Sequence, residues 1–102
     1  MLNLHPNCEL CDKDLPPQSL EACICSYECT FCRDCVENVL NNVCPNCGGG
    51  FVPRPIRPQG EHRPGEGLKN HPASSKRIHA KYSVEEIKAF SAKLSHIPPQ
   101  DR

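Results

Sequence analysis

Apolar residues recur with a helical period in two short stretches of the chain. The first is CVENVLNNVC, where the i, i+3, i+4, i+7 spacing of one helix face is occupied by Val36, Val39, Leu40 and Val43. Asp34 is a candidate N-cap in front of this stretch. The pattern predicts a helix with room to run to about residue 43.

The second stretch, SVEEIKAFSAKLSHI, predicts an amphipathic helix over residues 83–97. Ser83 and Glu86 have the spacing of a capping box, and Pro98 follows the last apolar position. The helix would present an apolar stripe of Ile87, Phe90 and Leu94. So short a helix is marginally stable alone, and we expect the stripe to meet the rest of the chain, a second copy or a partner.

Between these helices the pattern is lost. Residues 53–82 alternate proline, glycine and charged residues with little to bury, which predicts a flexible linker. Residues 98–102 read as a disordered end. The folded domain is therefore expected in residues 1–52, which is a short segment for a stable apolar core.

Composition indicates what holds that domain together. All nine cysteines lie in residues 1–52, aromatic residues make up 5% of the chain, and tryptophan is absent. A domain so poor in large apolar side chains needs a covalent or metal staple. The N-terminus does not read as a secretory signal, and an odd number of cysteines would leave one thiol unpaired in a disulfide framework. We therefore favour metal over disulfides, and a reduced, cytoplasmic protein.

The cysteines form four close pairs: 8/11, 25/29, 32/35 and 44/47. Tetrahedral Zn²⁺ takes four thiolates, usually two from each of two short loops, so four pairs predict two closed, structural Zn²⁺ sites. Interleaving would join the first pair to the third and the second to the fourth. The rival arrangement joins neighbouring pairs in order. We favour interleaving because it ties distant parts of the domain together, although spacing alone does not decide it.

Other chemistries fit these residues less well. An iron–sulfur cluster is disfavoured because the gap before Cys44 is longer than in the bacterial ferredoxin run. Cys23 fits no pair and is interpreted as a free thiol. His5 could replace a cysteine ligand, but eight cysteines suffice, and it is interpreted as a surface residue. No catalytic constellation is visible, which predicts a protein that is not an enzyme.

The charges differ sharply between the two halves of this neutral chain. Residues 1–52 hold two cationic and seven anionic side chains, whereas residues 53–102 hold ten cationic and five anionic ones. The acidic head should attract the basic tail, and we expect a weak, salt-sensitive contact between them. The dispersed basic residues also leave nucleic-acid binding as an alternative, without aromatic residues on which bases could stack.

The ladder of cysteines resembles a RING finger in which all eight ligands are cysteine, with CPNC as the last pair. The string from PNCELCDKDLPP to CPNCGGGFVPRP also resembles a family of small bacterial cysteine-rich proteins known only as a domain of unknown function. The resemblance covers about residues 1–57. It implies a small α+β, treble-clef fold with a crossed arrangement of two Zn²⁺ ions. The ligands would be Cys8, Cys11, Cys32 and Cys35 at site 1, and Cys25, Cys29, Cys44 and Cys47 at site 2.

RING ubiquitin ligases dock a conjugating enzyme through residues that this chain matches only in part. Leu10 and Pro45 match, but the chain has no tryptophan, and Gly48 stands where active ligases often carry a cation. We therefore expect a non-catalytic zinc module that presents a rigid platform to an unidentified protein partner. A RING-type ubiquitin-ligase-like adaptor and a nucleic-acid-binding protein are the alternatives. We assume a monomer without a membrane span. The expected partner-binding residues are Leu10, Pro45, Ile87, Phe90 and Leu94.

Overall fold

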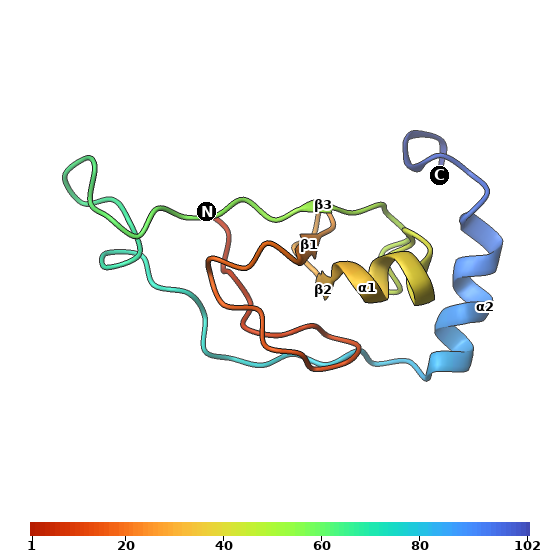
Figure 1. The fold of residues 1–102 in the computed structure, drawn as a ribbon. Helices are drawn as coiled ribbons and strands as arrows, with labels where there is room; N and C mark the ends of the chain where they lie inside the picture. Colours follow the sequence, from red (N-terminus) through yellow and green to blue (C-terminus); the bar gives the residue numbers. More distant parts are fainter.

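A computed structural model describes residues 1–102. A small antiparallel sheet lies at its centre, with strand order β2-β1-β3 (Figure 1). The strands are β1 (Ala22–Ile24), β2 (Thr30–Cys32) and β3 (Val52–Pro53). Strand β1 pairs with β2 in a hairpin and with β3 on its other edge. Strand β3 has no sequence signal, because two residues are too few for an alternating pattern.

The chain passes from β2 straight into a helix. This helix begins as α1 (Arg33–Cys35) and continues as a π-helical turn, η1 (Val36–Leu40). The predicted N-cap, Asp34, is wrong, because Cys32 at the end of β2 is the residue that keeps extended backbone there. The predicted end at residue 43 is also wrong. The helix ends at Leu40, where Asn41 and then Asn42 turn to positive φ, a conformation that asparagine tolerates better than most residues.

The core around the sheet is small. Its buried cluster has 12 members, of which half are cysteines: Cys8, Cys23, Cys25, Cys32, Cys35 and Cys44. Phe31 is completely buried and meets the half-buried Phe51 edge-to-face at 5.4 Å between ring centroids. So few large apolar side chains leave the cysteine clusters as the main means of holding this half of the chain together.

Two arginines fasten the first part of the predicted linker to the head. The guanidinium group of Arg54 is buried and donates to the carbonyl oxygens of His5, Leu15 and Pro16. Burial without a carboxylate partner lowers the pKa of Arg54. Arg57 donates in the same way to the carbonyls of Leu2 and His71. Segment 53–82 was expected to be a flexible linker, but these contacts and those of residues 74–80 hold parts of it against the head.

The returning part of that segment, residues 74–80, runs beside the N-terminal loop (Figure 1). Ser74 N donates to Asn3 O at 2.9 Å, and Ala80 N donates to Glu9 O at 2.7 Å. Arg77 pairs with both Asp12 and Asp14, at 2.8 and 2.7 Å. The basic tail therefore meets the acidic head through specific contacts.

Helix α2 (Val84–Leu94) forms where the sequence predicts it, and both hydrogen bonds of the capping box between Ser83 and Glu86 are present. The helix packs against η1, where the Ile87 side chain is 2% exposed and belongs to the core cluster. Ser91 Oγ donates to Leu40 O at 2.7 Å. The helix is therefore stabilised by docking on the head, which its short length requires.

The last residues differ from the expected disordered end. Pro99–Asp101 form a 3-10 helix, and the Arg102 side chain donates to the carbonyls of Ile97, Asn42 and Gly48. Those hydrogen bonds attach the C-terminus to the loop that follows η1. No helix in the structure combines the length and apolarity that crossing a membrane would need.

Candidate metal centres

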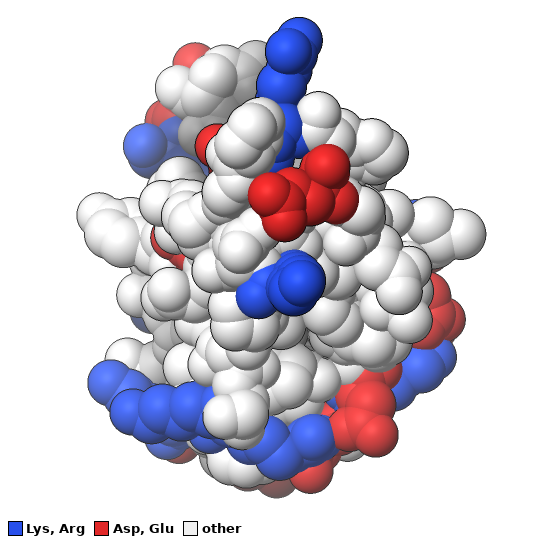
Figure 2. Space-filling view, turned by 90° about the vertical axis from the view of Figure 1, so that its left-hand side faces the viewer, with Lys and Arg blue, Asp and Glu red and all other residues white.

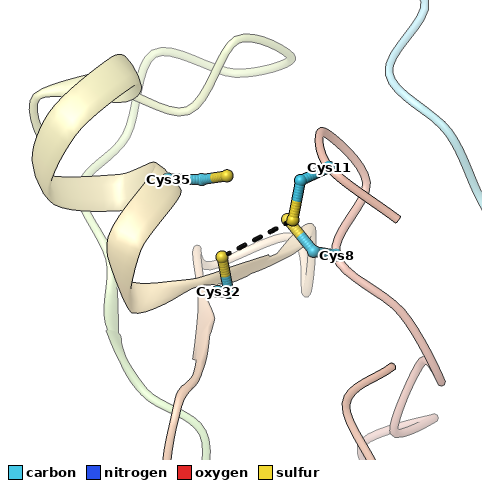
Figure 3. Close-up of side chains that lie close together, drawn as sticks. All are labelled: Cys8, Cys11, Cys32 and Cys35. Carbon is cyan, nitrogen blue, oxygen red and sulfur yellow. Dashed lines mark hydrogen bonds between the residues drawn. The ribbon is translucent and has the colours of Figure 1, made fainter. Parts of the chain in front are cut away.

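Four cysteine sulfur atoms meet at the junction of the N-terminal loop, β2 and α1 (Figure 3). They belong to Cys8, Cys11, Cys32 and Cys35, and all lie within 4.8 Å of one another. The Cys11 and Cys32 sulfur atoms are 3.8 Å apart. A tetrahedron with metal–sulfur bonds of about 2.3 Å has an edge of about 3.8 Å, whereas a disulfide would need about 2.05 Å. This first cluster can hold a metal ion.

Local backbone geometry places these four thiols. Cys8 and Cys11 lie in a tight turn in which Asp12 N donates to Cys8 O at 2.9 Å. Asp12 closes that turn in the left-handed conformation, with φ 65°. Glycine usually occupies such a position, but the CELC turn has none. Cys32 is the last residue of β2 and Cys35 the last of α1, so the strand-to-helix junction presents both.

A second cluster joins the hairpin turn to the loop after η1. Cys25, Cys44 and Cys47 have sulfur atoms within 4.8 Å of one another. The Cys44–Cys47 turn repeats the first one, since Gly48 N donates to Cys44 O at 2.8 Å and Gly48 has φ 80°. Gly49, the next residue, does not adopt the left-handed conformation. Its N–H donates to Cys47 Sγ, which is a candidate ligand atom.

Cys29 completes the pair with Cys25 but stands apart from that cluster. The two residues close the hairpin turn, with Cys25 N donating to Cys29 O at 3.2 Å, and Tyr27 N donates to Cys25 Sγ. The Cys29 sulfur lies outside the 4.8 Å group, yet it is near enough to raise the pKa of Cys44 by charge repulsion. Both clusters can hold metal ions, the second through three close thiols with Cys29 beside them.

The sulfur atoms are grouped crosswise along the chain. The pair 8/11 lies with 32/35, and Cys25 of the second pair lies with 44/47. This is the grouping of the interleaved arrangement and not of the sequential one. All nine cysteines are free of disulfides, and Cys23 is buried apart from both clusters.

The thiol pKa values show what a bound cation would change. Burial, followed by repulsion from neighbouring thiolates, raises the pKa of Cys35 and of Cys44 far above the ordinary value. Burial opposes ionisation of Cys11 too, but hydrogen bonds from the Lys13 backbone and the neighbouring thiols outweigh it and lower that pKa. Without a cation, Cys35 and Cys44 therefore keep their protons. Metal binding therefore releases protons and weakens as the pH falls.

Glu9 connects the two clusters. Its side chain is 5% exposed and lies between Cys8 and Cys11 in sequence. One carboxylate oxygen accepts from Thr30 N at 2.6 Å, and the other accepts from Asn46 Nδ2 at 3.4 Å. Asn46 belongs to the Cys44–Cys47 turn, so a single carboxylate links the first ligand turn, the hairpin and the second ligand turn. No sequence pattern singles out Glu9, because only its place between two candidate ligands could suggest a role.

The residues expected to bind a partner are dispersed. Leu10 is half-buried against the core, and Pro45 is buried. Ile87 was expected to face a partner, but it is buried against the head and is not available. Phe90 is 37% exposed and Leu94 is half-buried, both next to Gly48. The apolar stripe of α2 therefore packs mainly against the head of its own chain, because the head offers the nearest apolar surface.

Comparison with known proteins assigns the chain to a family. Residues 1–57 match the family described as Protein of unknown function (DUF1272). The chain belongs to this DUF1272 family. An uncharacterised protein of Rhizobium meliloti (strain 1021) is 54% identical over 78 residues, which is 76% of this chain and 86% of that one. Because 78 aligned residues exceed the 57 of the family match, the similarity to this DUF1272 relative continues into the tail. No solved structure matches the chain.

Proposed function

We propose that the protein is a non-catalytic, two-zinc module with a RING-like, treble-clef arrangement. Site 1 would be Cys8, Cys11, Cys32 and Cys35, and site 2 would be Cys25, Cys29, Cys44 and Cys47. The observation that carries the proposal is the all-sulfur donor set, with 3.8 Å between Cys11 and Cys32 sulfur atoms. Thiolate-only sites favour Zn²⁺ or iron–sulfur clusters, and closed Zn²⁺ sites are structural. Free thiolates need a reducing compartment, so we place the protein in the cytoplasm.

The proposed domain organisation keeps residues 1–52 as the zinc-binding unit. Residues 53–82 and the helix of residues 83–97 then act as a strap that packs across this unit. The contacts of Arg54, Arg77 and Ile87 support this division, because each attaches the strap to the head from a different part of the tail.

The platform for a protein partner would be a groove between α2 and the Cys44–Cys47 turn. This groove has a volume of about 400 Å³, and its lining includes Pro45, Tyr82, Ile87, Phe90 and Lys93. Tyr82 and Phe90 are 46% and 37% exposed at its rim, so a partner could bury further apolar area there. The zinc-bound turn would fix one wall of the groove and the docked helix the other.

The two alternatives find less support. A ligase-like adaptor would use Pro45 on an open surface, whereas Pro45 is buried and lines a groove whose other wall is α2. Nucleic-acid binding would use the tail's cations, but Arg54, Arg57 and Arg77 are engaged with carbonyls and carboxylates of this chain. On the face shown in Figure 2, a row of basic side chains along the lower edge lies beside acidic side chains.

Native mass spectrometry of the reduced protein, before and after chelation, tests the zinc proposal. Two ions with the mass of zinc per chain, lost together with the compact charge-state distribution on chelation, are the expected result. A chain that carries no zinc when purified and takes up none on titration would contradict it.

The platform is tested by co-purification with matched α2 variants. Phe90→Asp places a charge in the groove, whereas Ala92→Asp places the same charge on an exposed position outside its lining. We expect a partner retained by the wild type and by Ala92→Asp to be lost with Phe90→Asp. If all three proteins retained the same partners, the groove would not be the platform.

A further inference from the structure

The second cysteine cluster borders a cavity. This cavity has a volume of about 550 Å³ and lies between head loops and residues 78–82 of the tail. Cys29 and Cys47 both line it. Cys47 is exposed and Cys29 is half-buried, so solvent and small molecules in the cavity can reach the sulfur side of this cluster.

The first cluster borders no cavity, although its Cys11 is exposed. None of the cavities in the structure is lined by any of its four cysteines, and three of these are buried. Its four sulfur atoms also form one group within 4.8 Å, whereas in the second cluster the Cys29 sulfur falls outside that limit. The second cluster is therefore both the one that borders a cavity and the one with a distant fourth sulfur. That sulfur belongs to Cys29, which itself lines the cavity.

His5, which lines the same cavity, has a side-chain nitrogen without a hydrogen-bond partner. It lines the cavity together with Cys29 and Cys47, and its Nδ1 is the one buried side-chain nitrogen or oxygen without a hydrogen-bond partner. Buried polar atoms are ordinarily satisfied, so this unpaired nitrogen marks the cavity wall beside the second cluster as incompletely satisfied. The sequence indicated a surface residue, and in the structure His5 is half-buried, with only its Nδ1 shown to be inaccessible.

We propose that the cavity admits a small external thiol to the second metal centre, at the coordination position of Cys29. This inference rests on the proposed zinc binding. In the exchange, the bond between the metal and Cys29 Sγ breaks and a bond to the incoming sulfur forms. The incoming thiol gives up its proton and the released Cys29 thiolate takes one up, so no electrons are transferred. The first centre stays closed, and the second becomes the point at which metal and thiol ligands are exchanged.

Matched ligand deletions test this assignment. Cys29→Ala removes the corner at the cavity, and Cys11→Ala removes the exposed ligand of the first centre. Each variant is loaded with Co²⁺, whose thiolate charge-transfer absorbance reports the number of bound sulfurs, and is titrated with 2-mercaptoethanol. We expect Cys29→Ala to regain the four-sulfur spectrum and, in native mass spectra, to carry one added thiol. Cys11→Ala should do neither. Equal uptake by both variants, or uptake by neither, would overturn the proposal.

The wild-type protein gives a second test that does not depend on how a variant folds. With both centres loaded with ¹¹³Cd²⁺, a chelator should remove the ion at Cys25, Cys44 and Cys47 at least about tenfold faster than the ion at the first centre. Earlier loss from the first centre, or loss of both at one rate, would contradict the inference. A protein that binds two ions but shows either result fails only here, whereas one that binds none fails the zinc proposal itself.

Discussion

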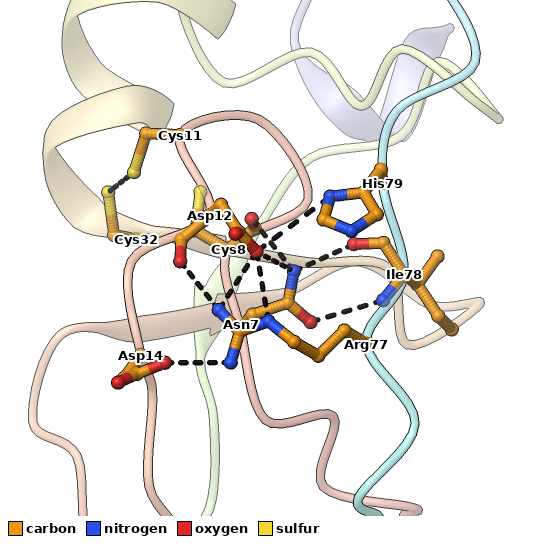
Figure 4. Close-up of polar contacts among 9 residues, drawn as sticks. All are labelled: Asn7, Cys8, Cys11, Asp12, Asp14, Cys32, Arg77, Ile78 and His79. Atoms are coloured by element: carbon orange, nitrogen blue, oxygen red, sulfur yellow. Dashed lines mark hydrogen bonds and ion pairs between the residues drawn. The ribbon is translucent and has the colours of Figure 1, made fainter.

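The Asn7 side chain pairs with the backbone of Ile78, 71 residues further along the chain. Asn7 Nδ2 donates to Ile78 O at 2.8 Å, and Ile78 N donates to Asn7 Oδ1 at 3.2 Å (Figure 4). The side-chain amide thus makes the two hydrogen bonds that a residue of a neighbouring β-strand would make with Ile78. Asn7 immediately precedes Cys8, so this link attaches the tail directly to the first ligand turn, and Asp12 at the end of that turn is attached through Arg77.

Asn7→Ala should release residues 77–80 from the head. Asn7 is 0% exposed, and its removal leaves Ile78 N and O without their partner, at a cost of about 2 kcal/mol. Hydrogen exchange of the Ile78 amide should accelerate accordingly. Asn38→Ala is the matched control, because Asn38 bonds only to exposed Asp34 and should leave this exchange rate unchanged. Unchanged protection in Asn7→Ala would show that the pairing does not hold the tail.

Gly48→Ala should destabilise the protein more than Gly65→Ala. Both glycines have nearly the same left-handed φ, 80° and 82°, which costs an alanine about 1–2 kcal/mol. At Gly48 a Cβ would also stand 3.1 Å from Leu94 Cδ1, whereas at Gly65 it would meet nothing within 4 Å. The difference between the two losses in unfolding free energy therefore measures the contact between the Cys44–Cys47 turn and α2. Equal losses would mean that α2 does not press on this turn.

Ile87→Ala should detach or loosen α2. Removing a buried isoleucine side chain costs about 2–5 kcal/mol, up to the limit set by the free energy with which the helix docks. Val84→Ala, at a side chain that is 48% exposed on the same helix, should have little effect. Amide protection across residues 87–94 distinguishes the two. Full protection in Ile87→Ala would contradict the packing described for the helix.

Cys23→Ala and Cys25→Ala separate a free thiol from a ligand. Cys23 is buried outside both clusters, and burial raises its pKa, so it should react slowly with alkylating reagents. We expect Cys23→Ala to retain two metal ions and Cys25→Ala to lose the ion of the second centre, as counted by native mass spectrometry. Loss of an ion from Cys23→Ala would require a different ligand set.

The features that the sequence predicted are those with local signals. The capping box and apolar stripe of α2 lie within one helix, and the ligand turns carry two cysteines each, so short windows of sequence contain them. The helix begins after Cys32 and not after Asp34, because β2 leads directly into it. It ends at Leu40, because the next two residues, both asparagines, adopt left-handed backbone conformations.

The charge asymmetry predicted a contact between tail and head, but the individual residues that dock the tail could not be predicted in this way. Arg54 and Arg57 bind main-chain carbonyls, which every residue offers, and Asn7 recognises a main-chain N–H and C=O. Such contacts leave no periodicity and no complementary residue type in the sequence. The proline-rich composition of residues 53–82 predicted a flexible linker, and the segment contains no helix in the structure. It did not reveal that the segment's polar side chains would attach it to the head.

The central claim is that two metal ions take the place of an apolar core, each supplying on the order of 10 kcal/mol of folding free energy. The most direct test is the ¹H–¹⁵N spectrum of the reduced protein after complete removal of metal. The account predicts that the dispersed amide resonances of residues 1–52 collapse and return when Zn²⁺ is added. If the metal-free, reduced chain kept those dispersed resonances, the claim would be contradicted.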